Sequence, residues 1–193
     1  MNLWIAKGVV LAASAAMVAI RAPHGHRSRT VKIVEDRKGG LEIALLVLAM
    51  LGFVVPLVWI VSPLLSFAEY PLRPVPLAGG IVFLAIGLYL FHRSHADLGT
   101  NWSITLQLRE GHHLVTQGVY RRIRHPMYTA LFLYSIGQTL ALPNWFAGPS
   151  YLVTFGILYV LRVRQEERMM LSKFGADYEV YMASTGRLLP RIR

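Results

Sequence analysis

Long apolar runs separated by short polar segments make up most of the chain. Five runs approach the ~20 residues that a helix needs to cross the hydrocarbon core of a bilayer. They cover roughly residues 2–20, 42–62, 76–92, 127–142 and 146–163. The pattern predicts an all-α integral membrane protein with about five transmembrane helices.

Basic residues gather in the segments that alternate between these runs. Residues 21–40 hold six Lys and Arg, 93–124 hold five and the tail from 162 holds seven, so 18 of the 20 fall on one side of a five-helix layout. Cytoplasmic loops carry such an excess, which predicts an outside N-terminus and a cytoplasmic C-terminus. The cationic stretch after residue 20 favours an uncleaved first span over a signal peptide. We expect the cell inner membrane if the source is prokaryotic, and the endoplasmic reticulum membrane if it is eukaryotic.

Composition agrees with a membrane protein and excludes several kinds of site. Of the 193 residues, 54% are hydrophobic and 16% are charged. A soluble domain of this size cannot bury so much apolar surface. The net charge of +10 is explained by the basic flanks, so we expect no nucleic-acid partner. The chain has no cysteine, which excludes disulfides, thiolate catalysis and cysteine-ligated zinc.

The predicted orientation brings two long polar segments, 93–126 and the tail 164–193, to the same face. Residues 164–174 suit a helix that ends at Gly175, and a second short helix is predicted over 177–183. The tail has an apolar side, which predicts packing on the membrane surface or against the first polar loop. That side consists of Met169, Met170, Phe174, Tyr178 and Tyr181.

Most of the histidines lie in or beside the segment 93–126. Two of them, in "HRSH" at 92–95, are three residues apart and share a helix face, so a membrane metal site is one interpretation. Interfacial histidines with ordinary hydrogen bonds are the other, and since the last two spans contain no histidine we expect no metal. The five residues are His92, His95, His112, His113 and His125.

Arg162 and Glu166 are four residues apart, so they share a helix face where the fifth span leaves the bilayer. A basic flank with a surface ion pair explains this spacing. However, Arg162 lies within the apolar register "ILYVLRV", and ionisable groups at such depth usually face a cavity or a ligand. We therefore favour a functional role for both residues.

The segment "GHHLVTQGVYRRIRHPMY" at 111–128 precedes the fourth span. "HHLVTQ" between its two glycines predicts a strand or turn, and Pro126 suits the first position of a helix. Backbone N–H groups after Pro126 favour an anion, although an anchoring flank fits equally well. Arg121 and Arg122 are explained as such a flank, and Arg124 fits either interpretation. The sequence lacks GxGxxG, P-loop and GxSxG motifs.

Four pieces of the chain together resemble the isoprenylcysteine carboxyl methyltransferase family. They are "LGTNWSITLQ" at 98–107, "GHHLVTQGVYRRIRHPMY" at 111–128, "RVRQEE" at 162–167 and "FGADYEVYMASTGRLLP" at 174–190. The likeness covers the last half of the chain, and the five-span layout is similar to compact prokaryotic members. It implies one membrane methyltransferase domain over 1–193, with accessory spans and loops in 1–75 and the motif-bearing catalytic region in 76–193.

The resemblance also implies roles for single residues. Arg162 matches the arginine assigned to the substrate carboxylate, and Glu166 matches the glutamate that binds the cofactor, S-adenosyl-L-methionine. The stretch between Gln107 and His112 is shorter than in eukaryotic members. The implied cofactor-binding residues are Gln107, His112, His113, Leu114, Val115, Tyr120, His125, Pro126, Met127, Tyr128 and Glu166.

Several acceptors and two other classes of function remain open. Family resemblance favours carboxyl O-methylation of a lipid-modified, isoprenylcysteine-like acceptor in the bilayer. A phospholipid amine, a quinone precursor or an isoprenoid acid is the alternative acceptor. The less favoured classes are a sterol-reductase-like enzyme that uses a nicotinamide cofactor, and a non-enzymatic membrane adaptor. The sequence makes no prediction of the oligomeric state.

Overall fold

The computed structural model describes residues 2–29, 33–36, 39–99, 107–109 and 113–191. Helices account for most of the described chain, as predicted, and one short two-stranded antiparallel sheet accompanies them. The elements are α1 (Leu3–Arg29), β1 (Ile33–Asp36), α2 (Gly40–Val61), η1 (Ser66–Ala68), α3 (Pro74–Leu98), β2 (Gln107–Arg109), η3 (Gly118–Arg121), α4 (Pro126–Ala141), α5 (Ser150–Phe174) and α6 (Ala176–Ser184).

Three helices of the described chain are long and apolar enough to cross a membrane: α1 over Leu3–Gly25, α2 over Gly40–Val61 and α3 over Pro74–Leu98. The protein is thus an integral membrane protein. Two further predicted spans correspond to α4, which has 16 residues, and to the first half of α5. The helix predicted over 164–174 is confirmed as the last part of α5, which runs without a break to Phe174.

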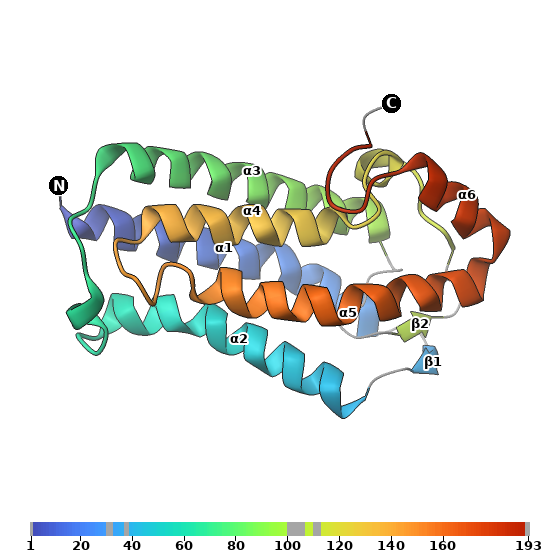
Figure 1. Ribbon diagram of the computed structural model, residues 1–193, viewed down its shortest axis with the longest axis horizontal. Coiled ribbons are helices and arrows are strands. Elements are labelled where there is room, and N and C mark those ends of the chain that lie inside the picture. The colour runs from blue at the N-terminus through green and yellow to red at the C-terminus, as the bar shows by residue number, and fades with distance from the viewer. Residues whose placement is uncertain (1, 30–32, 37–38, 100–106, 110–112, 192–193) are drawn as a thin grey trace.

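The five long helices lie side by side in one bundle (Figure 1). α3 packs most extensively on α4, α1 packs on α3, and α5 lies between α4 and α2. The two ends of the chain lie at opposite ends of the bundle's long axis. β1, β2 and α6 gather at the end away from the N-terminus, so the predicted polar segments lie together.

Close contact between α3 and α4 depends on glycine. A Cβ on Gly137 of α4 would lie 2.7 Å from Leu84 N and 2.8 Å from Gly80 O, both backbone atoms of α3. One on Gly87 would lie 2.8 Å from Tyr134 N. Small residues let helix backbones approach closely in membrane proteins, where packing rather than water exclusion drives association. The α3–α4 pair is therefore the most closely packed helix pair of the described chain.

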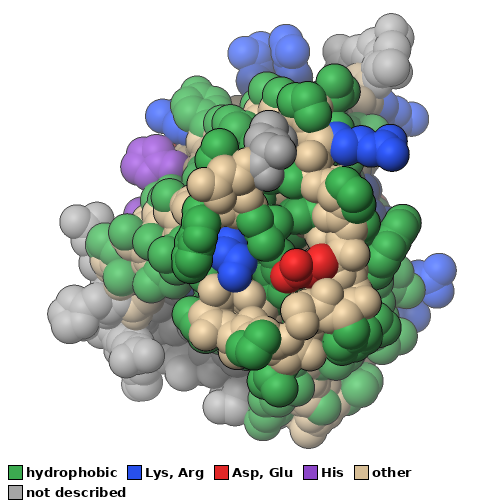
Figure 2. All heavy atoms as spheres, turned by 90° about the vertical axis from the view of Figure 1, so that its left-hand side faces the viewer, with side chains coloured by type: hydrophobic (Ala, Val, Ile, Leu, Met, Phe, Trp, Pro, Cys, Tyr) green, Lys and Arg blue, Asp and Glu red, His purple; other side chains and the backbone are tan. Residues whose placement is uncertain are grey.

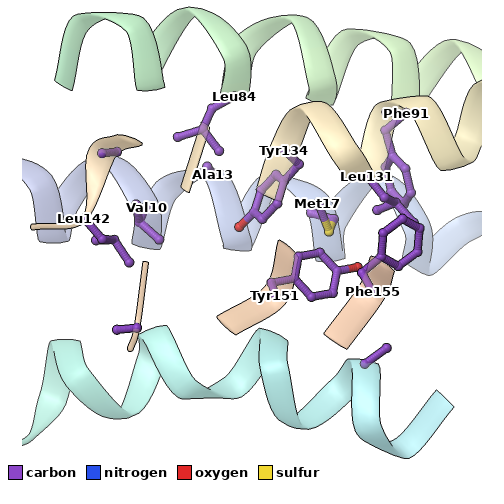
Figure 3. Close-up of a cluster of buried hydrophobic side chains, with 14 of the residues drawn as sticks. Val10, Ala13, Met17, Leu84, Phe91, Leu131, Tyr134, Leu142, Tyr151 and Phe155 are labelled. Atoms are coloured by element: carbon purple, nitrogen blue, oxygen red, sulfur yellow. The ribbon is translucent and has the colours of Figure 1, made fainter. Parts of the chain in front are cut away.

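Aromatic side chains from α4 and α5 fill the core beside this pair. In Figure 3, Tyr134 of α4 lies across α1 and Tyr151 of α5 lies between α1 and α2, and their ring centroids are 6.0 Å apart in an edge-on arrangement. The hydroxyl of Tyr134 lies 2.8 Å from Ser14 Oγ of α1, which ties the first helix to α4. Phe155 stacks edge-on against Phe132 at 5.1 Å and continues the aromatic core toward the far end.

Figure 2 shows the end of the bundle where the chain begins, covered mainly by hydrophobic side chains with a cationic and an acidic group near its middle. Lys7 lies over the rings of Trp4 and Trp59, 5.0 and 4.9 Å from their centroids, and donates to Ile60 O. Trp59 Nε1 in turn donates to Glu69 Oε1 at 2.8 Å. Lys7 and Glu69 are thus held by contacts with neighbouring aromatic side chains.

The C-terminal tail folds back on the segment before α4. Gly175 ends α5 at φ 52°, and its N–H donates to Leu171 O, as the predicted C-cap requires. After α6, Arg124 N donates to Gly186 O at 2.8 Å, and His125 N donates to Arg187 O at 3.0 Å. The tail was predicted to pack on the membrane surface or against the first polar loop; these backbone hydrogen bonds tie it to the start of α4, a contact that was not predicted. "HHLVTQ" also differs from prediction, because residues 113–117 are irregular.

We predict that Gly137→Ala destabilises the protein by about 1–3 kcal/mol, because the new methyl group forces α3 and α4 apart. Thermal unfolding of the detergent-solubilised protein measures this. Gly156→Ala on α5 is the control, since a Cβ there meets nothing within 4 Å. An equal effect of both substitutions would show that the close α3–α4 contact does not limit stability.

Candidate active site

A cavity of about 560 Å³ opens between the α1, α2, α4 and α5 helices and the C-terminal tail. Sites for small molecules typically have about 300–1,000 Å³. One part of its wall is apolar, with Met17, Val18 and Ala22 from α1 facing Leu46, Ala49, Met50 and Phe53 from α2. The remaining wall carries the polar and charged side chains. The cavity is therefore amphipathic.

Glu166 is the acidic side chain of the described cavity wall. Its Oε2 accepts a 2.6 Å hydrogen bond from Tyr128 OH, and its Oε1 lies 3.8 Å from His125 Nδ1. The side chain is 28% exposed, so part of the carboxylate still faces the cavity. Glu166 can therefore accept further hydrogen bonds from a ligand.

Arg162 lies one helical turn before Glu166 on α5, with 4.0 Å between Nε and Glu166 Oε2. Its guanidinium also lies 3.5 Å from Glu42 Oε1 of α2, and both of these side chains are buried. Glu42 stands in the first turn of a helix that is otherwise almost entirely apolar. The pair ties α2 to α5 beside the cavity and fixes the direction of the arginine.

Glu167 points away from the cavity and forms a buried ionic cluster. Its carboxylate accepts from Arg124 Nε at 3.3 Å and from Arg187 Nε at 3.0 Å, and His125 Nε2 lies 3.3 Å away. Burial acts to raise the pKa of Glu167, but hydrogen bonds from His125 and Arg187 outweigh it and lower this pKa to about 2. Glu167 thus stays ionised at all physiological pH values.

Arg124 connects this cluster to the tail. Its guanidinium donates to Met182 O at 3.0 Å and to Thr185 O at 2.5 Å. The tail is also held by Thr129, whose hydroxyl donates to Leu188 O at 2.6 Å. Arg124 lines the cavity and at the same time anchors the tail, so its geometry is compatible with both interpretations from sequence.

Tyrosines from η3 and α6 close the cavity on the tail side. Tyr181 OH donates to Tyr120 O at 2.7 Å, and Tyr120 OH donates to Ser94 O at 3.4 Å. Burial raises the pKa of Tyr181 to about 12, so its phenol remains a neutral donor. η3 itself is held by Asp97, which accepts from Val119 N at 2.9 Å.

Most of the residues predicted for the site line this one cavity. Pro126 is buried at the first position of α4 and supports the cavity wall without lining it. Only the backbone of Gln107 is described, in β2, and His112 lies outside the described residues. The predicted residues that line the cavity are His113, Leu114, Val115, Tyr120, His125, Met127, Tyr128, Arg162 and Glu166.

Sequence reasoning missed several residues of the cavity and its support. Glu42 had a usable signal, a lone carboxylate in an apolar run, which at membrane depth indicates a functional or paired group. Arg21 was counted only as part of a basic loop, yet it lines the cavity from α1. Four residues predicted only to pack also line it: Met169, Met170, Tyr178 and Tyr181.

Known proteins match the half of the chain that carries this cavity's polar wall. Residues 80–172 match the model of the isoprenylcysteine carboxyl methyltransferase (ICMT) family. The predicted family resemblance is confirmed. The protein-S-isoprenylcysteine O-methyltransferase of Tribolium castaneum is 33% identical over 115 residues, which are 58% of this chain and 41% of the relative. The one of Homo sapiens is 32% identical over 116 residues, 59% of this chain and 41% of the relative.

A solved structure extends the likeness beyond the matched half. A eukaryotic intramembrane Ras methyltransferase, isoprenylcysteine carboxyl methyltransferase, superposes with a TM-score of 0.57 and 26% sequence identity. The match covers 82% of this chain and 55% of that chain. The chain thus spans less than half the length of the two curated relatives, and the bundle itself resembles part of a methyltransferase.

We predict that Glu167→Gln lowers the stability of the protein at neutral pH by about 1–3 kcal/mol, because Arg124 loses its charged partner in a buried position. A lowered pKa stabilises the fold above the unfolded-state pKa of 4.5, and this contribution disappears as the pH falls toward 2. The difference in unfolding temperature between wild type and Glu167→Gln should therefore shrink below about pH 4.5. Glu179→Gln, on the exposed side of α6, is the matched control. A difference as large at pH 2 as at pH 7 would contradict the assignment.

Proposed function

We propose that this chain is an S-adenosyl-L-methionine-dependent carboxyl O-methyltransferase that acts on a lipid-modified, isoprenylcysteine-like carboxylate in the membrane. The observation that carries the proposal is the amphipathic cavity. Its polar wall holds Arg162, Glu166 and Tyr128, and its apolar wall comes from α1 and α2. A charged cofactor and an acceptor with a long apolar tail both find a matching surface there.

The chemistry of the polar wall suits the cofactor. A partly exposed carboxylate, Glu166, can accept from the ribose hydroxyls or the amino group of S-adenosyl-L-methionine. Tyrosine rings around it can stabilise a nearby cation through their π faces. The residues proposed to hold the cofactor are Glu166, His113, Leu114, Val115, Tyr120, His125, Met127 and Tyr128.

Arg162 is proposed to bind and orient the acceptor's carboxylate. When bound, S-adenosyl-L-methionine supplies a methyl group on a sulfonium, so that the carboxylate oxygen forms a bond to the methyl carbon while the carbon–sulfur bond breaks and its electron pair stays on sulfur. Because the nucleophile is already an anion, the site needs no general base. The contribution of the protein is then alignment of the carboxylate and exclusion of water.

The apolar wall is proposed to take the acceptor's lipid tail. On α2, Leu46, Ala49, Met50 and Phe53 follow the spacing of a single helix face, and all four line the cavity. α1 and α2 contact each other little, because α1 packs on α3 and α2 on α5. A tail can therefore reach the cavity between these two helices from the bilayer.

The proposed function also implies how the chain lies in the membrane. We propose five crossings, with α4 and the apolar half of α5 as the fourth and fifth, an outside N-terminus and a cytoplasmic C-terminus. Sixteen residues of α4 span about 24 Å at 1.5 Å per residue, slightly less than the ~30 Å hydrocarbon core. The opposite ends at which the two termini lie agree with an odd number of crossings (Figure 1).

Calorimetric titration of the detergent-purified chain with S-adenosyl-L-methionine tests the proposal, followed by a methyl-transfer screen. We expect binding, and transfer to the carboxylate of a prenylcysteine. If methyl transfer occurred only to a phospholipid amine or an isoprenoid acid, that compound would replace the isoprenylcysteine-like carboxylate as the proposed acceptor. Absence of binding would contradict a methyltransferase and favour an adaptor, and oxidation of a nicotinamide cofactor would favour a reductase.

We predict that Glu166→Gln weakens binding of S-adenosyl-L-methionine by about 10–100-fold, because a hydrogen bond to a charged acceptor is replaced by one to a neutral amide. Calorimetry measures the affinity directly. Glu179→Gln makes the same chemical change on an exposed surface and should bind like wild type. Equal affinities for wild type and Glu166→Gln would remove Glu166 from the cofactor site.

We predict that Ala49→Phe reduces turnover of farnesyl acceptors far more than that of shorter geranyl acceptors, because the ring occupies space in the apolar wall. Affinity for S-adenosyl-L-methionine should not change. Ala44→Phe is the matched control, since Ala44 is exposed on the same helix. If Ala49→Phe slowed both acceptors equally, the tail would have to lie elsewhere.

A further inference from the structure

Arg21 is the charged residue among the described α1 residues that line the cavity. The α1 residues that line the cavity are Met17, Val18, Arg21 and Ala22. Their spacing places them on one face of the helix, so Arg21 and the apolar residues beside it look into the same space. A guanidinium at the edge of an apolar wall suits a ligand that has an anionic head and an apolar tail.

The carboxylates around Arg162 mean that binding of the acceptor's carboxylate requires a second cationic side chain. Glu42 lies 3.5 Å and Glu166 4.0 Å from the Arg162 guanidinium, so its charge already faces two carboxylates. A third carboxylate that approached Arg162 alone would be repelled by both. Arg124 cannot supply the missing charge, because its guanidinium is held by Glu167 and by the backbone of the tail.

Arg21 can supply this charge from α1, because it lines the same cavity as Arg162 of α5. The positive charges of Arg21 and Arg162 repel each other, and Arg21 also interacts electrostatically with Tyr151 of α5. An anion between the two guanidinium groups would relieve that repulsion. Arg21 and Arg162 together balance the charges of Glu42 and Glu166. One more carboxylate can therefore bind only where it contacts both arginines.

We propose that Arg21 of α1 is a specificity-determining residue that binds the acceptor's carboxylate together with Arg162 of α5. The proposal rests on the proposed function. It assigns α1 two tasks: Met17 and Val18 contact the apolar tail while Arg21 contacts the anionic head. It also explains product release, because a methyl ester is neutral and loses its attraction to both guanidinium groups.

Matched acceptor ligands test this proposal. N-acetyl-S-farnesylcysteine and its carboxamide have the same tail and differ in charge at the head. Their affinities are measured by calorimetry in the presence of S-adenosylhomocysteine, for wild type, Arg21→Ala, Arg21→Lys and Arg73→Ala. Arg73 is an exposed arginine at the far end of the bundle and serves as the control.

We expect Arg21→Ala to weaken binding of the carboxylate by about 10–100-fold, the usual value of a charge-assisted hydrogen bond, and to leave the carboxamide nearly unchanged. Arg21→Lys should lie between, because it keeps the charge but loses the planar fork. Arg73→Ala should match wild type. If Arg21→Ala does not fold, as judged by S-adenosylhomocysteine binding, Arg21→Gln takes its place in the same comparison.

An equal loss for both ligands would assign Arg21 a structural role, and no loss for either would exclude it from the site; each result overturns the proposal. Failure of the proposed function is distinguishable, because wild type would then neither bind S-adenosyl-L-methionine nor methylate the farnesylcysteine. If wild type methylates the farnesylcysteine and Arg21→Ala binds the carboxylate as tightly as wild type, only the role of Arg21 is refuted and the proposed function stands.

Discussion

The buried carboxylate of Glu167 is the interaction on which the rest of the site depends. It accepts hydrogen bonds from Arg124 and Arg187, and His125 lies beside it, so three segments distant in sequence meet at one group. Adjacent residues on a helix point in different directions, so the same turn of α5 directs Glu166 into the cavity. The two neighbouring glutamates thus have different roles: Glu167 holds the tail against the start of α4, and Glu166 faces the cavity.

The C-terminal tail and the helices together give the cavity a polar side and an apolar side. Tyrosines of α6 and η3 close its polar side, and apolar faces of α1 and α2 form the other side. The start of α4 is held by the hydrogen bond from His125 N to Arg187 O, and Tyr128 is held by its hydrogen bond to Glu166. A methyl transfer to a carboxylate requires alignment and exclusion of water rather than proton transfer, and a rigid polar wall beside an apolar one suits that requirement.

Sequence patterns predicted the helices well, because hydropathy and capping signals such as Gly175 and Pro126 are local. The motif residues were predicted through the family resemblance, and most of them lie in one cavity. What the sequence could not reveal depends on contacts between distant segments. Glu42 pairs with Arg162 across 120 residues, and Arg21 reaches the cavity only because α1 continues past the predicted end of the span to Arg29. The tail's place against Arg124 and His125 depends on backbone hydrogen bonds, which leave no pattern in the sequence.

The central claim is that one cavity holds the cofactor at its polar wall and the acceptor's tail at its apolar wall. An experimental structure of the wild-type protein with S-adenosylhomocysteine and N-acetyl-S-farnesylcysteine tests it most directly. The account predicts the nucleoside ligand beside Glu166 and Tyr128, the carboxylate beside Arg162 and the farnesyl chain between α1 and α2. Density for either ligand outside this cavity, or a farnesyl chain against the opposite face of α5, would contradict it.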